Sequence, residues 1–136
     1  MSGTELVYLD SSALVKLVVT ESETPALRAY LAGKTTASSE IAVVEVMRAV
    51  ARQHPDRAGT VQAVAQAVVE SLHLLPLSPD TVTAACAVEP PALRSLDAIH
   101  IASALALVEV LDSMVTYDIR MQEGARLAGL TVAAPA

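Results

Sequence analysis

Four carboxylates in the sequence stand among apolar residues, where an acidic side chain needs a specific partner. Burying an unpaired carboxylate is costly, so such a group requires a cation, a hydrogen-bond network or a raised pKa. Converging carboxylates also repel one another, and hard divalent cations such as Mg²⁺ or Mn²⁺ accept oxygen ligands. If the fold gathers them, the four predict a divalent-cation site; they are Asp10, Glu45, Asp97 and Asp118.

Each acid also has a purely structural interpretation. Asp10 and Asp118 could cap helices or turns, and Asp97 could stabilise the first turn of a helix through the helix dipole. Glu45 lies too far into a predicted helix for that dipole interaction, but it could pair with a nearby arginine, Arg48 or Arg52. A fifth acid, Asp112, precedes Asp118 by six residues and could replace or join it.

Histidine and cysteine offer little alternative chemistry. His100 follows Asp97 by three residues and could face the same direction, but we interpret it first as a packed histidine on a buried helix. Cys86 is the only cysteine, which excludes an internal disulfide and a cysteine-rich zinc site, and we interpret it as a small buried side chain. The three histidines are scattered, so zinc has poor support.

Strand and helix signals alternate along the chain and must position these acids. Apolar and β-branched runs predict strands at 5–10, 74–77, 113–117 and 130–133. Helical spacing, serine and proline starts and glycine stops predict helices from Ser11 and over 21–31, 39–52, 55–72, 78–88, 95–110 and 118–128. This alternation predicts one α/β domain over 1–136, a three-layer sandwich around a mostly parallel sheet. Ligands bind beyond the carboxyl ends of such strands, where Asp10 and Asp118 are expected.

Composition excludes several classes of protein. The 136 residues carry a net charge of -6 and only three aromatic side chains, all tyrosine, which argues against a basic groove that stacks bases. The N-terminus lacks the pattern of a secretory signal, and acidic residues interrupt the longest apolar stretch, so we expect a cytoplasmic protein without a membrane span. No glycine-rich phosphate loop, serine elbow or late lysine of a receiver domain is present.

Four segments together resemble a known family. The segments 8–17, 44–49, 93–104 and 115–121 are similar to motifs of the PIN-domain ribonucleases, above all the VapC toxins of bacterial type II toxin–antitoxin pairs. The likeness extends over nearly the whole chain. It implies a PIN-like fold and a metal-dependent endoribonuclease.

The resemblance also implies functions for particular residues and partners. The matching acids Asp10, Glu45, Asp97 and Asp118 would hold one or two Mg²⁺ ions, with Mn²⁺ as a possible substitute. Polar side chains would line the same pocket; they are Ser11, Ser12 and Thr116. A homodimer is expected, as is a VapB-type antitoxin that covers the site and inserts an arginine among the acids. The sequence itself offers helices at 22–31 and 39–52 against which an amphipathic antitoxin helix could lie.

Recognition of an RNA substrate is our own inference from the positive charges near these motifs. With so few aromatic residues, contacts to RNA phosphates would fall to basic side chains, and the RNA would be recognised as a structured or looped target. The candidates are Lys16, Arg48, Arg94 and Arg120. The alternative function is a PIN-like module that binds RNA or a partner protein without cutting.

Overall fold

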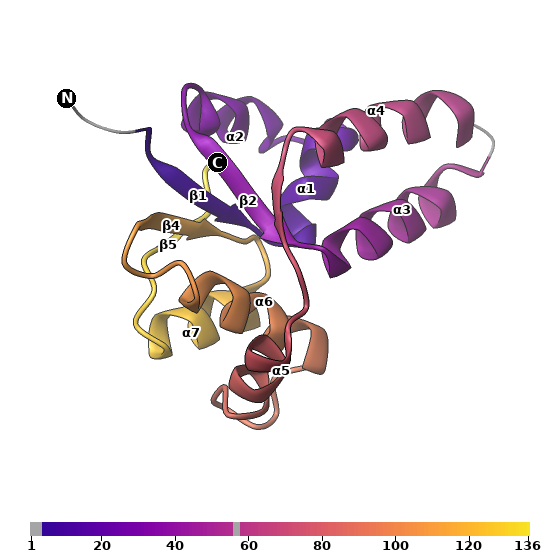
Figure 1. Ribbon diagram of the computed structural model, residues 1–136. Coiled ribbons are helices and arrows are strands. Elements are labelled where there is room, and N and C mark those ends of the chain that lie inside the picture. Colours follow the sequence, from indigo (N-terminus) through magenta and orange to yellow (C-terminus); the bar gives the residue numbers. More distant parts are fainter. Residues whose placement is uncertain (1–3, 56–57) are drawn as a thin grey trace.

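The computed structural model describes residues 4–55 and 58–136 and contains a central five-stranded parallel sheet in the order β3-β2-β1-β4-β5. The strands are β1 (Leu6–Leu9), β2 (Thr35–Ser39), β3 (His73–Leu75), β4 (Leu111–Val115) and β5 (Val132–Ala133). The helices are α1 (Ser11–Val18), α2 (Thr24–Leu31), α3 (Ile41–Gln53), α4 (Ala58–Glu70), α5 (Pro79–Cys86), α6 (Ser95–Leu105) and α7 (Ile119–Leu127). The predicted three-layer α/β fold is confirmed (Figure 1).

Two apolar cores cover the two faces of the sheet. Because successive strand residues point to opposite faces, Val7 and Leu9 contribute to the core under α1 to α4, whereas Tyr8 enters the core under α6 and α7. Helices α3 and α4 form a hairpin that projects away from the sheet, and α5 packs beside α6 (Figure 1). Among the described residues, each helix is too short or too polar to cross a lipid bilayer.

Several predicted elements need correction. Strand β2 lies where no strand was expected, because its Thr and Ser residues lack the apolar pattern that predicts a strand. Ser38 is nevertheless buried, and its hydroxyl donates to the Leu9 carbonyl at 2.7 Å. Helix α6 ends at Leu105 and not at 110, since the chain turns there before β4. Strand β4 ends at Val115, so Asp118 follows it by three residues.

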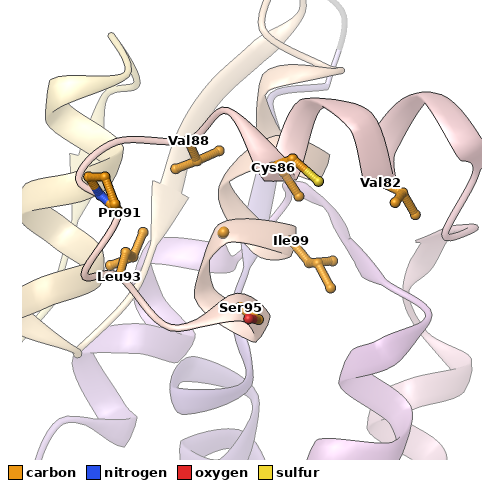
Figure 2. Close-up of a pocket in the computed structure, with 9 residues that line it drawn as sticks. Val82, Cys86, Val88, Pro91, Leu93, Ser95 and Ile99 are labelled. Atoms are coloured by element: carbon orange, nitrogen blue, oxygen red, sulfur yellow. The ribbon is translucent and has the colours of Figure 1, made fainter.

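Cys86 is exposed, which contradicts the expectation of a buried side chain. Its helix α5 is short and buries none of its residues. The thiol lies at a pocket of about 330 Å³ between α5, the segment that follows it and the start of α6 (Figure 2). The pocket lining is mostly apolar; Figure 2 labels Val82, Cys86, Val88, Pro91, Leu93, Ser95 and Ile99.

Gly124 allows α7 to approach α6 closely. A Cβ atom at this buried position would lie 3.0 Å from Ile101 Cδ1 and 3.2 Å from Leu93 Cδ2. Ile101 is itself fully buried, so its side chain has little room to move. We expect Gly124→Val to lower the free energy of unfolding in urea by about 1 to 3 kcal/mol through overpacking. Gly59→Val on α4 is the control, because a Cβ atom there would meet no atom of the described residues within 4 Å; a similar loss in this variant would contradict the packing argument.

Candidate functional site

Asp10 lies at the point where the sheet order reverses. Strand β1 connects to β2 on one side, while β4 occupies the other side, so the connections diverge beyond their carboxyl ends. The residue follows β1 directly and is 2 % exposed. Its Oδ1 accepts from the Ser12 hydroxyl at 2.6 Å and the Ala13 N–H at 3.0 Å, and its Oδ2 accepts from Thr116 at 2.6 Å. Asp10 therefore caps α1 and is also fixed by two hydroxyl groups.

Asp118 reaches the same edge from the segment after β4. It is exposed and caps α7, because its Oδ1 accepts from the backbone N–H groups of Arg120 at 2.9 Å and Met121 at 3.2 Å. These bonds engage one carboxylate oxygen, and no side chain of the described residues donates to Oδ2. The capping interpretation from sequence is thus correct for both Asp10 and Asp118, and it leaves a second function open.

Asp97 is close enough to two other acids for their charges to raise its pKa. It lies half-buried in the first turn of α6. Burial raises the pKa of Asp97, and the negative charges of Asp118 and Asp10 raise it further, while the nearby His100 and Arg94 oppose this rise. Burial likewise raises the pKa of Asp10, against the hydrogen bonds that favour its charged form. Three acids from different parts of the chain therefore share one electrostatic environment.

The raised pKa of Asp97 predicts a pH-dependent effect on stability. When the folded-state pKa of a carboxyl exceeds its unfolded value, the stability it contributes is complete below the unfolded pKa of about 3.9 and is lost as the pH rises through the folded pKa. In buffer with chelator, Asp97→Asn should therefore unfold at higher urea concentration than the wild type at pH 7, and the difference should shrink at pH 4. Glu109→Gln, at an exposed position, is the control for the charge change; equal gains at both pH values would contradict the prediction.

Glu45 is held by two side chains from other helices. Its Oε1 lies 2.6 Å from His100 Nε2, and its Oε2 accepts from the Ser11 hydroxyl at 3.1 Å. The alternative interpretation of Glu45, a pairing with Arg48 or Arg52, finds no support among the contacts of the described residues, since Glu45 contacts His100 and Ser11 instead. His100 is indeed buried and packed, as expected, but it also contacts this acid directly.

A groove of about 560 Å³ opens beside Glu45, between α1 and α3. Two guanidinium groups line it, Arg48 and Arg52, and across residues 4–55 and 58–136 no carboxylate lies within salt-bridge distance of either. Val44 is 60 % exposed and Leu96 47 % exposed at its rim. The groove thus places two positive charges beside Glu45. We call Glu45, Asp10, Asp97 and Asp118 together the acidic edge. Arg52 was not among the predicted phosphate contacts, although it follows Arg48 by one helical turn, a spacing that would have indicated it.

The other predicted cations lie in different surroundings. Lys16 donates to Glu21 at 3.2 Å and to Glu23 at 3.3 Å, so its charge is already neutralised locally. Arg94 precedes α6 and is close enough to lower the pKa of Asp97. Arg120 lines a separate pocket of about 230 Å³ between α7 and the segment that precedes α6.

Asp112 lies at the opposite edge of the sheet. It stands near the start of β4, where its Oδ2 accepts from Ser113 at 3.2 Å and from Tyr30 at 3.5 Å. Because Asp10 and Asp118 lie beyond the other ends of the strands, Asp112 does not join them.

The four acids have the ligand atoms that a hard divalent cation prefers, but their side chains are spread too widely to surround one ion. The acids offer only oxygen ligands, and the negative charges of Asp118 and Asp10 add to burial in raising the pKa of Asp97; a cation would offset these charges. Within the described part of the chain, however, no three acidic, histidine or cysteine side chains are grouped closely enough to surround one ion. To hold a common ion, the acids at this edge would therefore have to turn their side chains toward one another.

Comparison with known proteins identifies relatives over almost the whole chain. Residues 7–127 match the model of the PIN domain. The chain is 38 % identical to Ribonuclease VapC47 of Mycobacterium tuberculosis (strain CDC 1551 / Oshkosh) over 135 residues, covering 96 % of this chain and 97 % of the relative. It is 40 % identical over 130 residues to Ribonuclease VapC46 of M. tuberculosis (strain ATCC 25618 / H37Rv), covering 95 % and 97 % respectively.

Solved structures share the fold at lower sequence identity. A crystal structure of VapBC2 from Rickettsia felis bound to a DNA fragment from its promoter superposes with a TM-score of 0.73 at 16 % identity, covering 96 % of this chain and 99 % of that one. The sarcin-ricin loop cleaving toxin VapC20 of M. tuberculosis superposes with a TM-score of 0.71 at 15 % identity, covering 95 % and 99 %.

Proposed function

Because the chain belongs to the PIN-domain family, we propose that it is a metal-dependent endoribonuclease and the toxin of a VapBC-type toxin–antitoxin pair. The observation that carries the proposal is the acidic edge beyond β1 and β4, where Asp10 accepts from Thr116 at 2.6 Å, Asp118 caps α7 two residues later, and Asp97 lies in the first turn of α6. Relatives named as VapC ribonucleases, at 38 to 40 % identity over most of the chain, support RNA as the substrate.

The acids of the edge would hold Mg²⁺, with Mn²⁺ as a substitute; they are Asp10, Glu45, Asp97 and Asp118. The chemistry that such a cation supplies when bound is activation of water and neutralisation of charge on the phosphoryl oxygens. The chain itself orients the acids: Ser12 and Thr116 fix both oxygens of Asp10, and Ser11 fixes one oxygen of Glu45. Fixed carboxylates reduce the reorganisation needed when charge develops during the reaction.

The groove between α1 and α3 would carry the RNA backbone toward the acids. Arg48 and Arg52 on its wall can hydrogen-bond phosphate oxygens, a task to which the guanidinium geometry is suited. Arg94 would contribute beside Asp97, while Lys16 would first have to leave Glu21 and Glu23.

A VapB-type antitoxin and a second copy of the chain are the proposed protein partners. The exposed Val44 and Leu96 flank the acidic edge, so an antitoxin segment that covered them would also block the groove. Exposed apolar residues elsewhere, including Val110 and Leu127, offer surface for a homodimer. Co-expression with a small neighbouring reading frame should yield a copurifying complex that no longer cuts RNA, and light scattering of the isolated chain should report a dimer.

Cleavage of RNA by the purified chain tests the proposed function. The probe is total cellular RNA, incubated with Mg²⁺, with Mn²⁺ or with excess chelator, and the cut ends are mapped by sequencing. We expect discrete cuts in either metal and none in chelator. Cleavage that persists in chelator would overturn the metal dependence. RNA binding without cleavage under every condition would instead favour the non-cutting binding module.

A further inference from the structure

A network of hydrogen bonds, buried at Tyr8 and His100 and part-buried at Glu45 and Ser11, links four separate elements behind the acidic edge. The hydroxyl of Tyr8, on β1, lies 2.7 Å from Nδ1 of His100, on α6. Nε2 of the same imidazole lies 2.6 Å from Oε1 of Glu45, on α3, and Oε2 of Glu45 accepts from Ser11, on α1. The network joins residues separated by 92, 55 and 34 positions in the sequence. It therefore ties together the elements that surround the site.

The direction of the central bond follows from the chemistry of its partners. An ionised carboxylate has only acceptor atoms, so His100 Nε2 must carry the proton that is donated to Glu45. This holds in either protonation state of the imidazole. In the neutral ring Nδ1 accepts from the Tyr8 hydroxyl, and in the cation Nδ1 donates to it. His100 Nε2 therefore donates to Glu45 whichever way the proton is shared between Nδ1 and the Tyr8 hydroxyl.

The imidazole is much more deeply buried than the carboxylate that it contacts. His100 and Tyr8 have no exposed surface, and their rings meet edge to face at 5.8 Å between centroids and 73° between planes. The Glu45 side chain has more rotatable bonds than that of His100 and is 21 % exposed. A flexible, partly exposed glutamate samples several rotamers unless a fixed partner selects one of them. His100 supplies that fixed partner.

We propose that His100 is a positioning residue, which holds the Glu45 carboxylate in one orientation at the acidic edge. This inference rests on the proposed function for its consequence but not for its geometry. His100 lies one turn after Asp97 on α6, so the same helix that carries one acid also places another. Each oxygen of Glu45 receives one donor from the protein and keeps further acceptor capacity for a ligand.

Two substitutions at His100 separate hydrogen bonding from packing. His100→Gln keeps an N–H donor near the position of Nε2, whereas His100→Leu fills the space without a donor. Crystal structures of the metal-free variants should show Glu45 in its original orientation in the Gln variant and displaced or disordered in the Leu variant. Calorimetric titration with Mn²⁺ should give a dissociation constant about 10 to 100 times higher for Leu and one within about threefold of wild type for Gln.

A double-mutant cycle tests whether His100 acts through Glu45. In a Glu45→Ala background, His100→Leu should cause no further loss of Mn²⁺ affinity, because the carboxylate that it positions is absent. An equal loss in both backgrounds would show a general structural effect and would overturn the proposal. Should His100→Leu fail to fold with the Tyr8 hydroxyl left unpaired, Tyr8→Phe/His100→Leu removes both polar partners and replaces it in every measurement.

The readouts distinguish this inference from the proposed function. If the wild-type chain binds no Mn²⁺, the metal dependence of the proposed function fails, while the crystal structures still decide whether His100 orients Glu45. If Glu45 keeps its orientation in the Leu variant, the positioning proposal is overturned even when metal binding and RNA cleavage are normal.

Discussion

Asp10→Asn is expected to lower the rate of RNA cleavage at least about 1,000-fold, equivalent to about 4 kcal/mol of transition-state stabilisation. Asp10 is the most buried of the four acids that would hold the cation. Replacing it with a neutral amide removes a charged oxygen ligand from the centre of the site. The measurement is the initial rate of cutting of a mapped RNA substrate at saturating Mg²⁺.

The same substitution should leave the fold intact. The amide oxygen of Asn can still accept from Ala13 N–H and the Ser12 hydroxyl, so the cap of α1 is kept. The amide nitrogen can donate to the Thr116 hydroxyl, which now points its own proton elsewhere. Because burial raises the pKa of Asp10 and so opposes its charge, the neutral variant should unfold in urea no earlier than the wild type at pH 7.

Asp112→Asn is the matched control, since it makes the same chemical change at the opposite edge of the sheet. It should retain full cleavage. If Asp10→Asn stayed within tenfold of the wild-type rate, the acidic edge would not be the catalytic site. If Asp112→Asn lost as much activity as Asp10→Asn, the effect would be one of charge or stability and not of position.

The layered fold and the acidic edge follow from local patterns in the sequence. Strand β1 and helix α1 were predictable because an apolar run passes directly into helical spacing at Asp10. Strand β2 was not, because Ser38 and Ser39 are buried as polar residues, and Ser38 is satisfied by a bond to a backbone carbonyl 29 positions away. Propensity describes the isolated segment, whereas this strand depends on its neighbour β1.

The hydrogen-bond network behind the acids shows a second limit of sequence analysis. The spacing of Asp97 and His100 indicates that they share a side of α6, but it does not reveal what else lies there. Tyr8 and Glu45 become neighbours of His100 only when the tertiary fold brings β1, α3 and α6 together. A pattern along the chain can therefore identify the acids, while the side chains that orient them require the tertiary structure.

Reversing the two arginine charges in the groove, with Arg48→Glu/Arg52→Glu, is expected to lower kcat/KM for RNA about 100-fold, or about 2.8 kcal/mol. Both side chains line the groove beside Glu45 without a carboxylate partner in the described part of the chain, so their charge is available to phosphate groups. The loss should appear mainly in KM, because the arginines would contact the RNA backbone and not the reacting atoms.

Salt dependence and a matched variant identify the cause of this loss. Two lost phosphate contacts should reduce the slope of log affinity against log salt by about 1.4, at about 0.7 for each contact with single-stranded RNA. Arg28→Glu/Arg126→Glu changes the net charge equally but lies on α2 and α7, outside the groove. If the loss came from net charge alone, both double variants would bind RNA equally weakly. If it came from lost phosphate contacts in the groove, only Arg48→Glu/Arg52→Glu would bind RNA weakly. Equal losses of kcat/KM in the two double variants would therefore show that RNA does not bind in the groove, and the acidic edge would be its only contact with the described residues.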